Sequence, residues 1–326
     1  MLSTLRTRIA AAAMAAGLAT AALPAAAEEI SVTHWGALMY GTPYAVAMDK
    51  GFFKEAGIDI TGILSSKGGG TTVRNVIAGG LPYGEVALSA AIAGMKEGLD
   101  IKIISTGVQV VADILWVTMP NSDIKSVKDL VGKKMAITSP KSVTDMLSIM
   151  VLEASGIPLD KIERPALGSV GAGLTALESG VVQSASIIDP IYSARKDKYR
   201  VLFYVKDILP PMTQSVGITT TEFAKSHPDK LRAIVAGRRK GVDYIYANPK
   251  ESAAILAREY NLPVPVAESA VNNMVALNYW SRGGFDIKGM NEMIRGLKII
   301  GEVQGDIDWD KVIDRSFLPA DLRARS

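Results

Sequence analysis

The predicted fold is decided by the stretch HWGALMYGTPYAVAMDKGFFKEAGIDI, which runs from His34 to Ile60. Thr42 is suited to cap the N-terminus of a helix, and Pro43 to lie in its first turn. Gly51 is suited to end that helix, because glycine adopts the left-handed conformation easily. The pattern therefore predicts a helix of about two turns between Thr42 and Gly51.

Strands are expected on both sides of this helix, one over Glu29–Trp35 and a second from near Ile58. A strand, a helix and a parallel strand form a right-handed β-α-β unit. Open α/β folds place their ligands at the carboxyl edge of such a sheet. We therefore expect ligand contacts from four side chains after the first strand: Trp35, Tyr40, Thr42 and Tyr44.

A family resemblance is carried by the pattern W-x4-Y-G-T-P-Y-A-V-A-x-D-K-G-F-F-K-E-A-G-I-D, which begins at Trp35. It resembles the opening of the periplasmic substrate-binding proteins of nitrate, sulfonate and taurine ABC importers. The likeness continues to roughly the end of the chain but is most specific here. It implies a type II periplasmic binding protein, with two α/β lobes, each a mostly parallel sheet with flanking helices. It also implies a ligand held between the lobes and delivery to a membrane permease with its ATPase.

The first 27 residues are typical of a secretory signal peptide. Arg6 and Arg8 precede an alanine-rich apolar run, and small residues stand before Glu28. The alternative is a membrane anchor, which needs about 20 apolar residues. The whole chain has 36 basic and 33 acidic residues, so the exported part is nearly neutral. This charge balance argues against a nucleic-acid partner.

The chain has no cysteine. A disulfide, a thiolate zinc site and a lipid-modified cysteine are therefore excluded. We expect a soluble periplasmic protein of a two-membrane bacterium, without a direct membrane anchor, without a cofactor and monomeric.

A length of 326 residues suggests two domains. We expect one lobe over residues 28–112, a second over 113–210, and a return to the first over 211–326. The apolar run Ala112–Met119 and the segment Lys206–Thr219 are the expected crossings. Helices are predicted over Val143–Ala154 and, with other C-terminal helices, over Pro228–Tyr246. The C-terminal helices are expected to pack on the first lobe.

Helix N-termini that face the cleft form the first candidate site. They are expected at Thr42, over Gly68–Thr72 in the predicted loop Ser65–Thr72, at Ser142 and over Ser169–Gly173. Free backbone N–H groups and the helix dipole bind anions without a charged side chain. In the loop, we expect contacts from Ser66, Gly70 and Thr71. The alternative is that these segments are ordinary turns of an α/β protein.

Aromatic residues form the second candidate site, since their rings could enclose the body of a ligand. Core packing is the alternative for each one. The set is Trp35, Tyr40, Tyr44, Trp116, Tyr192, Tyr279 and Trp280.

Asp189 stands before Pro190 at the end of a predicted strand. The family resemblance implies that Asp189 contacts an amino or hydroxyl group of the ligand. The alternative is a helix N-cap with Pro190 as the first helical residue. Ser89, at the end of the matching first-lobe strand, has the same two interpretations. Cationic candidates for the anion are Lys67, Arg74, Lys141 and Arg282, of which Arg282 lies in a glycine-rich loop beside two aromatic residues.

The sequence favours a binding protein over an enzyme. His34 and His227 are the only histidines, and both are expected to be structural. The metalloprotease and α/β-hydrolase motifs are missing. We therefore predict a receptor for a small organic anion. The expected ligand is a sulfonate or a carboxylate, and aromatic members of both classes are included. Three alternatives stay open: an enzyme related to thiamine-pyrimidine synthesis, a pyrimidine-precursor binding protein, and a soluble sensor with a separate membrane partner.

Overall fold

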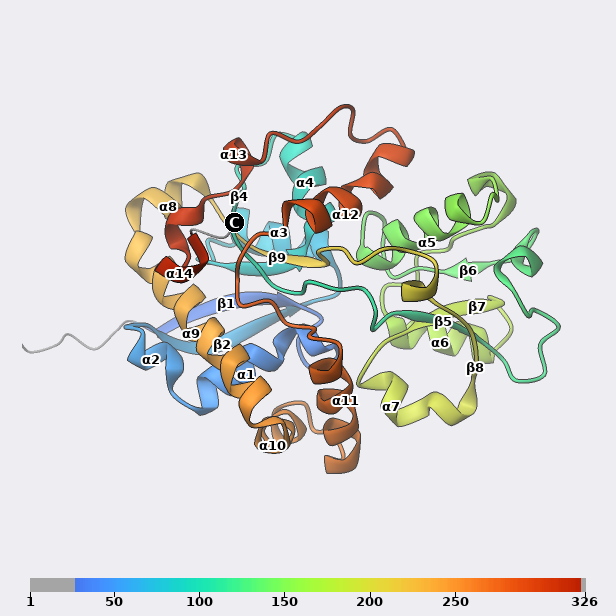
Figure 1. The fold of residues 1–326 in the computed structure, drawn as a ribbon, viewed down its shortest axis with the longest axis horizontal. Helices are drawn as coiled ribbons and strands as arrows, with labels where there is room; N and C mark the ends of the chain where they lie inside the picture. Colours follow the sequence, from blue (N-terminus) through green and yellow to red (C-terminus); the bar gives the residue numbers. More distant parts are fainter. Residues whose placement is uncertain (1–26, 324–326) are drawn as a thin grey trace, which may run out of the picture.

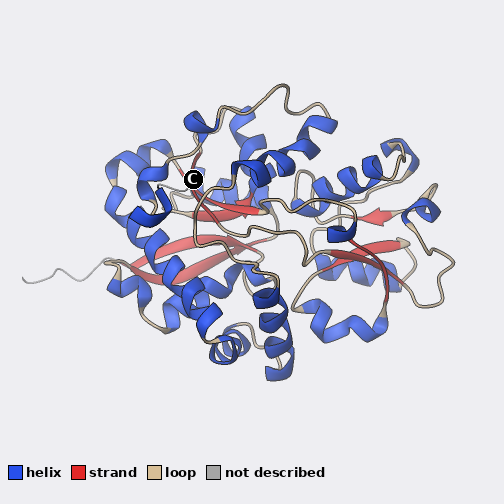
Figure 2. Ribbon diagram, viewed as in Figure 1, coloured by secondary structure: helices blue, strands red, loops and turns tan. Residues whose placement is uncertain are grey.

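The computed structural model describes residues 27–323, which form two lobes, each with helices around a central sheet (Figures 1 and 2). The predicted signal peptide lies outside the described residues, apart from its last position. The first sheet has the strand order β2-β1-β3-β9-β4. Its strands are β1 (Ala27–Thr33), β2 (Asp59–Ser66), β3 (Gly84–Ala87), β4 (Lys102–Thr106) and β9 (Ser215–Thr219). β9 is antiparallel to both of its neighbours, and the other strands share one direction.

The second sheet has the order β6-β7-β5-β8. Its strands are β5 (Leu115–Thr118), β6 (Met135–Ala136), β7 (Ser184–Ile187) and β8 (Arg200–Tyr204). Here β5 is the strand that runs against the others. Each sheet is thus mostly parallel with one reversed strand, and the predicted α/β fold class is confirmed. The exact lobe boundaries at residues 113 and 211 stay a prediction.

The first β-α-β unit follows the prediction except at the N-cap of its helix. Helix α1 (Thr42–Asp49) has Pro43 in its first turn, and Gly51 has a φ of 73° in the left-handed region. The predicted capping role of Thr42 is wrong, because Gly41 occupies the N-cap position. The Thr42 hydroxyl donates instead to the carbonyl of Met39, at 3.1 Å, inside the preceding turn.

Gly41 is required by its neighbours. A side chain at this position would overlap the ring of Trp35 and the hydroxyl of Tyr260. These two rings contact each other edge-on, with centroids 5.2 Å apart. The backbone at the start of α1 can therefore approach them only because residue 41 has no Cβ atom.

Helices cover both sheets (Figure 2). After α2 (Phe52–Glu55), these are α3 (Gly69–Ile77), α4 (Leu88–Lys96), α5 (Val143–Ala154), α6 (Val170–Glu178) and α7 (Ile191–Arg195). The predicted helix over Val143–Ala154 is confirmed at both ends. Helix α3 starts earlier than the predicted loop allowed, because the carbonyl of Gly68 already accepts from the N–H groups of Thr71 and Thr72.

The C-terminal helices pack on both lobes. They are α8 (Thr221–Ser226), α9 (Pro228–Ala247), α10 (Pro249–Glu259), α11 (Val264–Ala276), α12 (Ile287–Ile299), α13 (Trp309–Val312) and α14 (Ala320–Arg323). Helices α9 and α10 contact α1 of the first lobe, as predicted (Figure 1). Helix α11 contacts α10, and α12 contacts α4, so both also pack on the first lobe, but they have further contacts with α7 and α5 of the second lobe that were not predicted. No helix within residues 27–323 is long and apolar enough to span a membrane.

A buried ion pair lies in the first lobe beside β3. The Glu85 carboxylate accepts from Nε of Arg238 at 3.0 Å and from the hydroxyl of Tyr44 at 2.6 Å. Both charged side chains are almost fully buried. Arg238 also donates to the carbonyls of Gly107 and Ser281, at 2.7 and 2.8 Å. The guanidinium therefore joins β3 to the start of the chain between β4 and β5, residues 107–114, which we call the first connecting segment.

Tyr44 is thus a core residue, which corrects the prediction that it contacts ligand. Its side chain has no exposed surface. Its hydroxyl is bonded to Glu85 and Tyr83. Tyr44 belongs to the side of α1 that faces the sheet, and α9 covers this region from outside.

Candidate functional site

A small cavity lies where the two lobes meet. The volume open to the centre of a water molecule is about 20 Å³, which is room for about one water. First-lobe residues line one side and second-lobe residues the other. The lining residues are Thr33, His34, Leu38, Tyr40, Gly68, Gly69, Ala87, Thr138, Ser142, Val143, Thr144, Val170 and Ile188.

Four helix N-termini meet at this cavity. Gly69 begins α3, Ala87 precedes α4, Ser142 caps α5, and Val170 begins α6. Each of these residues lines the cavity or stands at its edge. The first N–H groups of a helix have no partner within the helix, and the macrodipole adds partial positive charge there. The arrangement can therefore hold an anion without a charged side chain.

Hydroxyl groups surround the cavity on the second-lobe side. The Thr138 hydroxyl lies 3.0 Å from that of Ser142 and 2.9 Å from that of Thr144. The Ser142 hydroxyl also accepts from the N–H of Asp145, at 3.3 Å, which is the helix cap. Hydroxyl hydrogens rotate to suit their partners, so this cluster can turn donors toward a bound anion.

A matching group comes from the first lobe. Thr33, at the end of β1, has its hydroxyl 2.6 Å from that of Thr72, which in turn lies 2.6 Å from that of Ser66. Thr33 also donates to the carbonyl of Glu85 at 2.9 Å. The two clusters approach the cavity from opposite lobes, and the hydroxyls of the first lobe orient one another.

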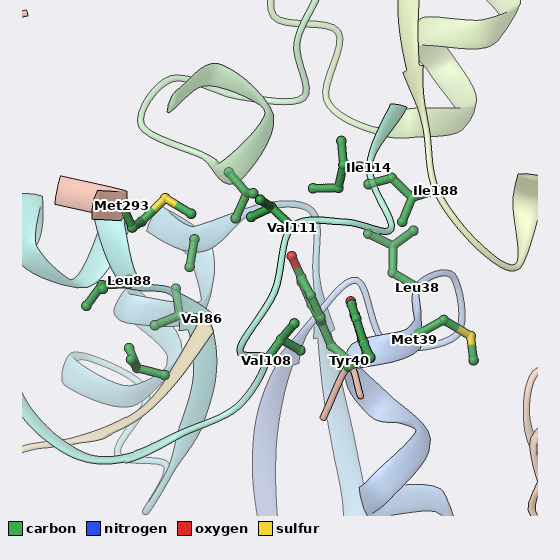
Figure 3. Packing of buried hydrophobic residues seen from close by; sticks show 14 of the residues in the cluster. Leu38, Met39, Tyr40, Val86, Leu88, Val108, Val111, Ile114, Ile188 and Met293 are labelled. Carbon is green, nitrogen blue, oxygen red and sulfur yellow. The ribbon is translucent and has the colours of Figure 1, made fainter. Parts of the chain in front are cut away.

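Apolar side chains from both lobes also line the cavity. Figure 3 shows Leu38, from the loop after β1, beside Ile114 of the first connecting segment and Ile188 of the second lobe. Leu38 and Ile188 both line the cavity, and both are buried. Their burial excludes water from the space that the helix N-termini face, which strengthens any hydrogen bond formed there.

Tyr40 connects the cavity to the hinge. It lines the cavity, and its hydroxyl donates to the side-chain oxygen of Gln214. The Gln214 amide nitrogen donates to Asp113, at 3.0 Å, and to the carbonyl of Val110, at 2.8 Å. Tyr40 belongs to the same buried cluster as Val108 and Val111 of the first connecting segment (Figure 3).

The two connecting segments also pair through their backbones. The N–H of Gln214 donates to Val108 at 2.8 Å, and that of Val205 donates to Ile114 at 3.1 Å. The chain thus passes between the lobes in two segments that are joined by backbone hydrogen bonds. This is the geometry of a hinge.

We expect Asp113 to make stability depend on pH. Burial raises the pKa of its carboxyl from 3.8 to about 7. The folded protein therefore keeps this proton up to about pH 7, whereas the unfolded chain loses it near pH 4. The free energy of unfolding should fall as pH rises across this window, by at most about 4 kcal/mol.

Urea unfolding of the wild type and of Asp113→Asn at about pH 5 and about pH 7.5 checks this expectation. The amide cannot titrate, so the variant should lose part of the decline seen in the wild type. An equal decline in both proteins would contradict it.

Four of the predicted site residues lie at or near the cavity. Tyr40 and Ser142 line it. The Ser66 hydroxyl lies 2.6 Å from that of Thr72, which in turn contacts the lining residue Thr33. Ser89 lies at the lobe interface, where its hydroxyl donates to the carbonyl of Lys141 at 2.7 Å. Their contact with a ligand stays a prediction.

Asp189 is placed as a local cap and not in this cavity. Its Oδ1 accepts from the N–H of Ser193 at 2.9 Å, and its Oδ2 accepts from Asn273 of α11 at 2.9 Å. Pro190 is not the first helical residue, since it occupies the N-cap position of α7. Asp189 thus accepts from the first turn of α7 from the position before the N-cap, and its contact with a ligand stays a prediction.

The remaining predicted residues lie away from the cavity. Trp35 packs on Tyr260, and the Thr42 hydroxyl is used within its own turn. Arg282 forms an exposed ion pair with Asp243. Gly70 and Thr71 belong to the first turn of α3 and do not line the cavity. Of the aromatic set, Trp116, Tyr279 and Trp280 are fully buried core residues.

Sequence reasoning missed several lining residues, chiefly Thr33, His34, Thr138 and Thr144. Thr33 is the last residue of β1, His34 follows it, and Thr138 stands two residues after β6. The position at a strand end is the signal that could have found them.

A second hollow, an outer groove of about 440 Å³, is lined by residues of both lobes. Its walls are mostly small or aliphatic: Gly36, Ala37, Gly171, Thr175, Pro190, Ile191, Ala194, Arg195 and Leu262. Three of these segments follow cavity-lining residues within two positions, after His34, Val170 and Ile188. Neighbouring parts of both lobes therefore line the groove and the cavity.

Two α/β lobes around an interlobe cavity define the periplasmic binding protein fold. The chain belongs to the NMT1/THI5 like family, whose model matches residues 39–252. It is 24% identical over 293 residues to a Bacillus subtilis (strain 168) protein named "Putative aliphatic sulfonates-binding protein", covering 87% of this chain and 86% of that one.

Solved structures share the fold. The periplasmic aliphatic sulphonate binding protein SsuA of Escherichia coli matches with a TM-score of 0.72 and 19% identity, over 89% of this chain and 92% of that one. The alkanesulfonate-binding protein SsuA of Xanthomonas axonopodis pv. citri, bound to MOPS, matches with a TM-score of 0.74 and 15% identity, over 89% and 99%. At these identities, the likeness concerns the fold alone.

Proposed function

We propose that this chain is the extracytoplasmic solute-binding component of an ABC importer, which carries a small organic anion to a membrane permease. The proposal is carried by one observation: four helix N-termini and two hydroxyl clusters converge on a neutral cavity between two lobes. Such a site binds an anion with neutral donors and releases it unchanged. No covalent step is needed, so the proposed role is not enzymatic.

The proposed ligand has an anionic head and an apolar body. The inner cavity, at about 20 Å³, suits only the head in this closed arrangement. The outer groove, at about 440 Å³, offers an apolar surface for a body several atoms long. A bare inorganic anion would leave the groove unfilled. Names of similar proteins support a sulfonate, and a carboxylate has the same donor requirement.

Contacts between the lobes support closure around the ligand. Nζ of Lys141, in the second lobe, lies 3.1 Å from Glu97 and 3.2 Å from Glu302. Arg295 of α12 pairs with Glu153 of α5. These ion pairs are partly exposed and individually weak, so the lobes can separate at small cost. The permease is proposed to recognise the closed form, in the periplasm, as a monomeric complex.

A thermal-shift panel on the mature chain tests the proposal. Sulfonates, aromatic carboxylates, nitrate and pyrimidines are added singly, in buffers that contain neither sulfonate nor carboxylate. We expect an organic sulfonate or carboxylate to raise the melting temperature, because a ligand at 100 times its Kd adds about 2.7 kcal/mol of stability. The bound compound should be recovered intact.

Other outcomes of the panel redirect the proposal. If only pyrimidines raise the melting temperature, the chain is a pyrimidine-precursor binder. If a compound is converted, the enzyme alternative is favoured. If no anion stabilises the chain, the proposed function is wrong.

A further inference from the structure

His34 occupies a restricted position at the edge of the cavity. Its φ of 57° lies in the left-handed region, which is uncommon for residues other than glycine. Its N–H donates to the carbonyl of Ser66 at 2.8 Å, and its carbonyl accepts from Ala37 and Leu38, both at 3.0 Å. Such a conformation persists where the surroundings hold it in place, and it is frequent at ligand sites.

The imidazole of His34 has no partner. Within residues 27–323, none of the hydrogen bonds or ion pairs of the structure uses its ring nitrogens. Burial lowers the pKa of His34 to about 4, so that the ring is neutral at pH 7. The side chain is half-buried at the edge of the cavity, so its ring nitrogens are available to a ligand.

The cavity contains no fixed charge. None of its lining residues is Asp, Glu, Lys or Arg, and only His34 and Tyr40 can titrate. His34 is thus the one lining group that can become cationic near neutral pH. An anion bound beside it, in a cavity with room for about one water, favours the protonated ring.

Charged groups on the adjoining elements are already paired. Asp145 of α5 accepts from Arg164 and from the N–H of Lys141. Lys141 pairs with Glu97 and Glu302. Asp113 is linked to Tyr40 only through Gln214. None of these groups appears among the causes of the shift at His34, which is due to burial alone.

We propose that His34 is a ligand-contact residue that takes up a proton when the lobes close on an anion, so that affinity rises as pH falls. The inference rests on the proposed function and deepens it. A bound anion raises the pKa of the ring above its value in the free protein. The added affinity is therefore complete below the pKa of the free protein and is lost as pH rises through that of the complex.

Isothermal titration with an alkanesulfonate or benzenesulfonate tests the inference, because a sulfonate stays ionised throughout. Titrations are run at about pH 5 and about pH 8, in two buffers of different ionisation enthalpy. We expect affinity about tenfold higher at the lower pH, which corresponds to a ring pKa in the complex about one unit above that pH. The buffer comparison should show net proton uptake on binding.

Variants assign the proton to one residue. In His34→Asn, the new side chain tolerates the left-handed backbone and keeps a neutral donor, but it cannot titrate. This variant should bind the sulfonate with nearly equal affinity at both pH values. The matched control is His227→Asn, because His227 is the other histidine. It is exposed at the C-cap of α8, stacked on Phe223, and does not line the cavity. It should keep the wild-type pH dependence.

The outcomes separate the two proposals. Equal sulfonate affinity of the wild type at both pH values overturns the role of His34 and leaves the proposed function standing. A pH dependence that survives in His34→Asn but disappears in Asp113→Asn also overturns it, because the proton then belongs to the hinge. If no sulfonate or carboxylate binds at either pH, both proposals are wrong.

Discussion

Replacing Arg238 with Met is expected to lower the free energy of unfolding by about 3–5 kcal/mol. The change removes one partner of a buried pair and leaves the Glu85 carboxylate without its cation. The carbonyls of Gly107 and Ser281 also lose their donors. Because Gly107 begins the first connecting segment, we expect the hinge to loosen together with the core. Urea unfolding followed by circular dichroism gives the free energy.

Arg239→Met is the matched control on the same helix. Arg239 makes a two-pronged ion pair with Asp321, at 2.6 and 2.8 Å, but on the exposed surface. Its loss should cost less than about 1 kcal/mol. Adding Glu85→Gln to Arg238→Met should recover part of the stability, since the unpaired buried charge is then gone. A mild effect of Arg238→Met, similar to the control, would contradict the importance of the pair.

Replacing Gly68 with Val is expected to weaken ligand binding by up to about a hundredfold, because overpacking costs about 1–3 kcal/mol. Gly68 lines the cavity, and a Cβ atom there would lie 2.9 Å from Oγ of Ser139 in the opposite lobe. Its φ of 173° is extended, so valine fits the backbone. The side chain should hold the lobes apart. Unliganded melting should change little, while the ligand-induced thermal shift disappears.

Gly70→Ala is the control for this prediction. A Cβ atom at Gly70 meets only Nη1 of Arg74, at 3.6 Å, outside the cavity. The variant should keep its affinity and gain a fraction of a kcal/mol, because alanine favours the helix over glycine. X-ray scattering with a bound sulfonate should show compaction for Gly70→Ala and not for Gly68→Val. Normal binding by Gly68→Val would place the ligand elsewhere.

Local chemistry made part of this structure predictable. The turn at Gly51, the position of Pro43 and both ends of the helix Val143–Ala154 depend on neighbours within a few residues, and all three are confirmed. The fold class followed from the family resemblance in the opening stretch. The convergence of helix N-termini was expected for α3, α5 and α6, but not for α4.

The side-chain contacts were less predictable, because they depend on the tertiary arrangement. Tyr44 and Tyr40 are four residues apart, yet the first bonds to Glu85 in the core and the second lines the cavity. Which of them faces the sheet depends on β3 and α9, far away in sequence. His34 was expected to be structural, and only the closed cavity shows that its ring lacks a partner.

The neutral lining of the cavity also affects how quickly a solute can arrive and leave. Attraction between a fixed surface charge and an oppositely charged solute accelerates encounters but is screened by dissolved salt. Amides and hydroxyls act only at short range, so capture here depends little on ionic strength. Under the proposed function, this mode of recognition makes capture of the solute insensitive to changes in the salinity outside the cytoplasmic membrane.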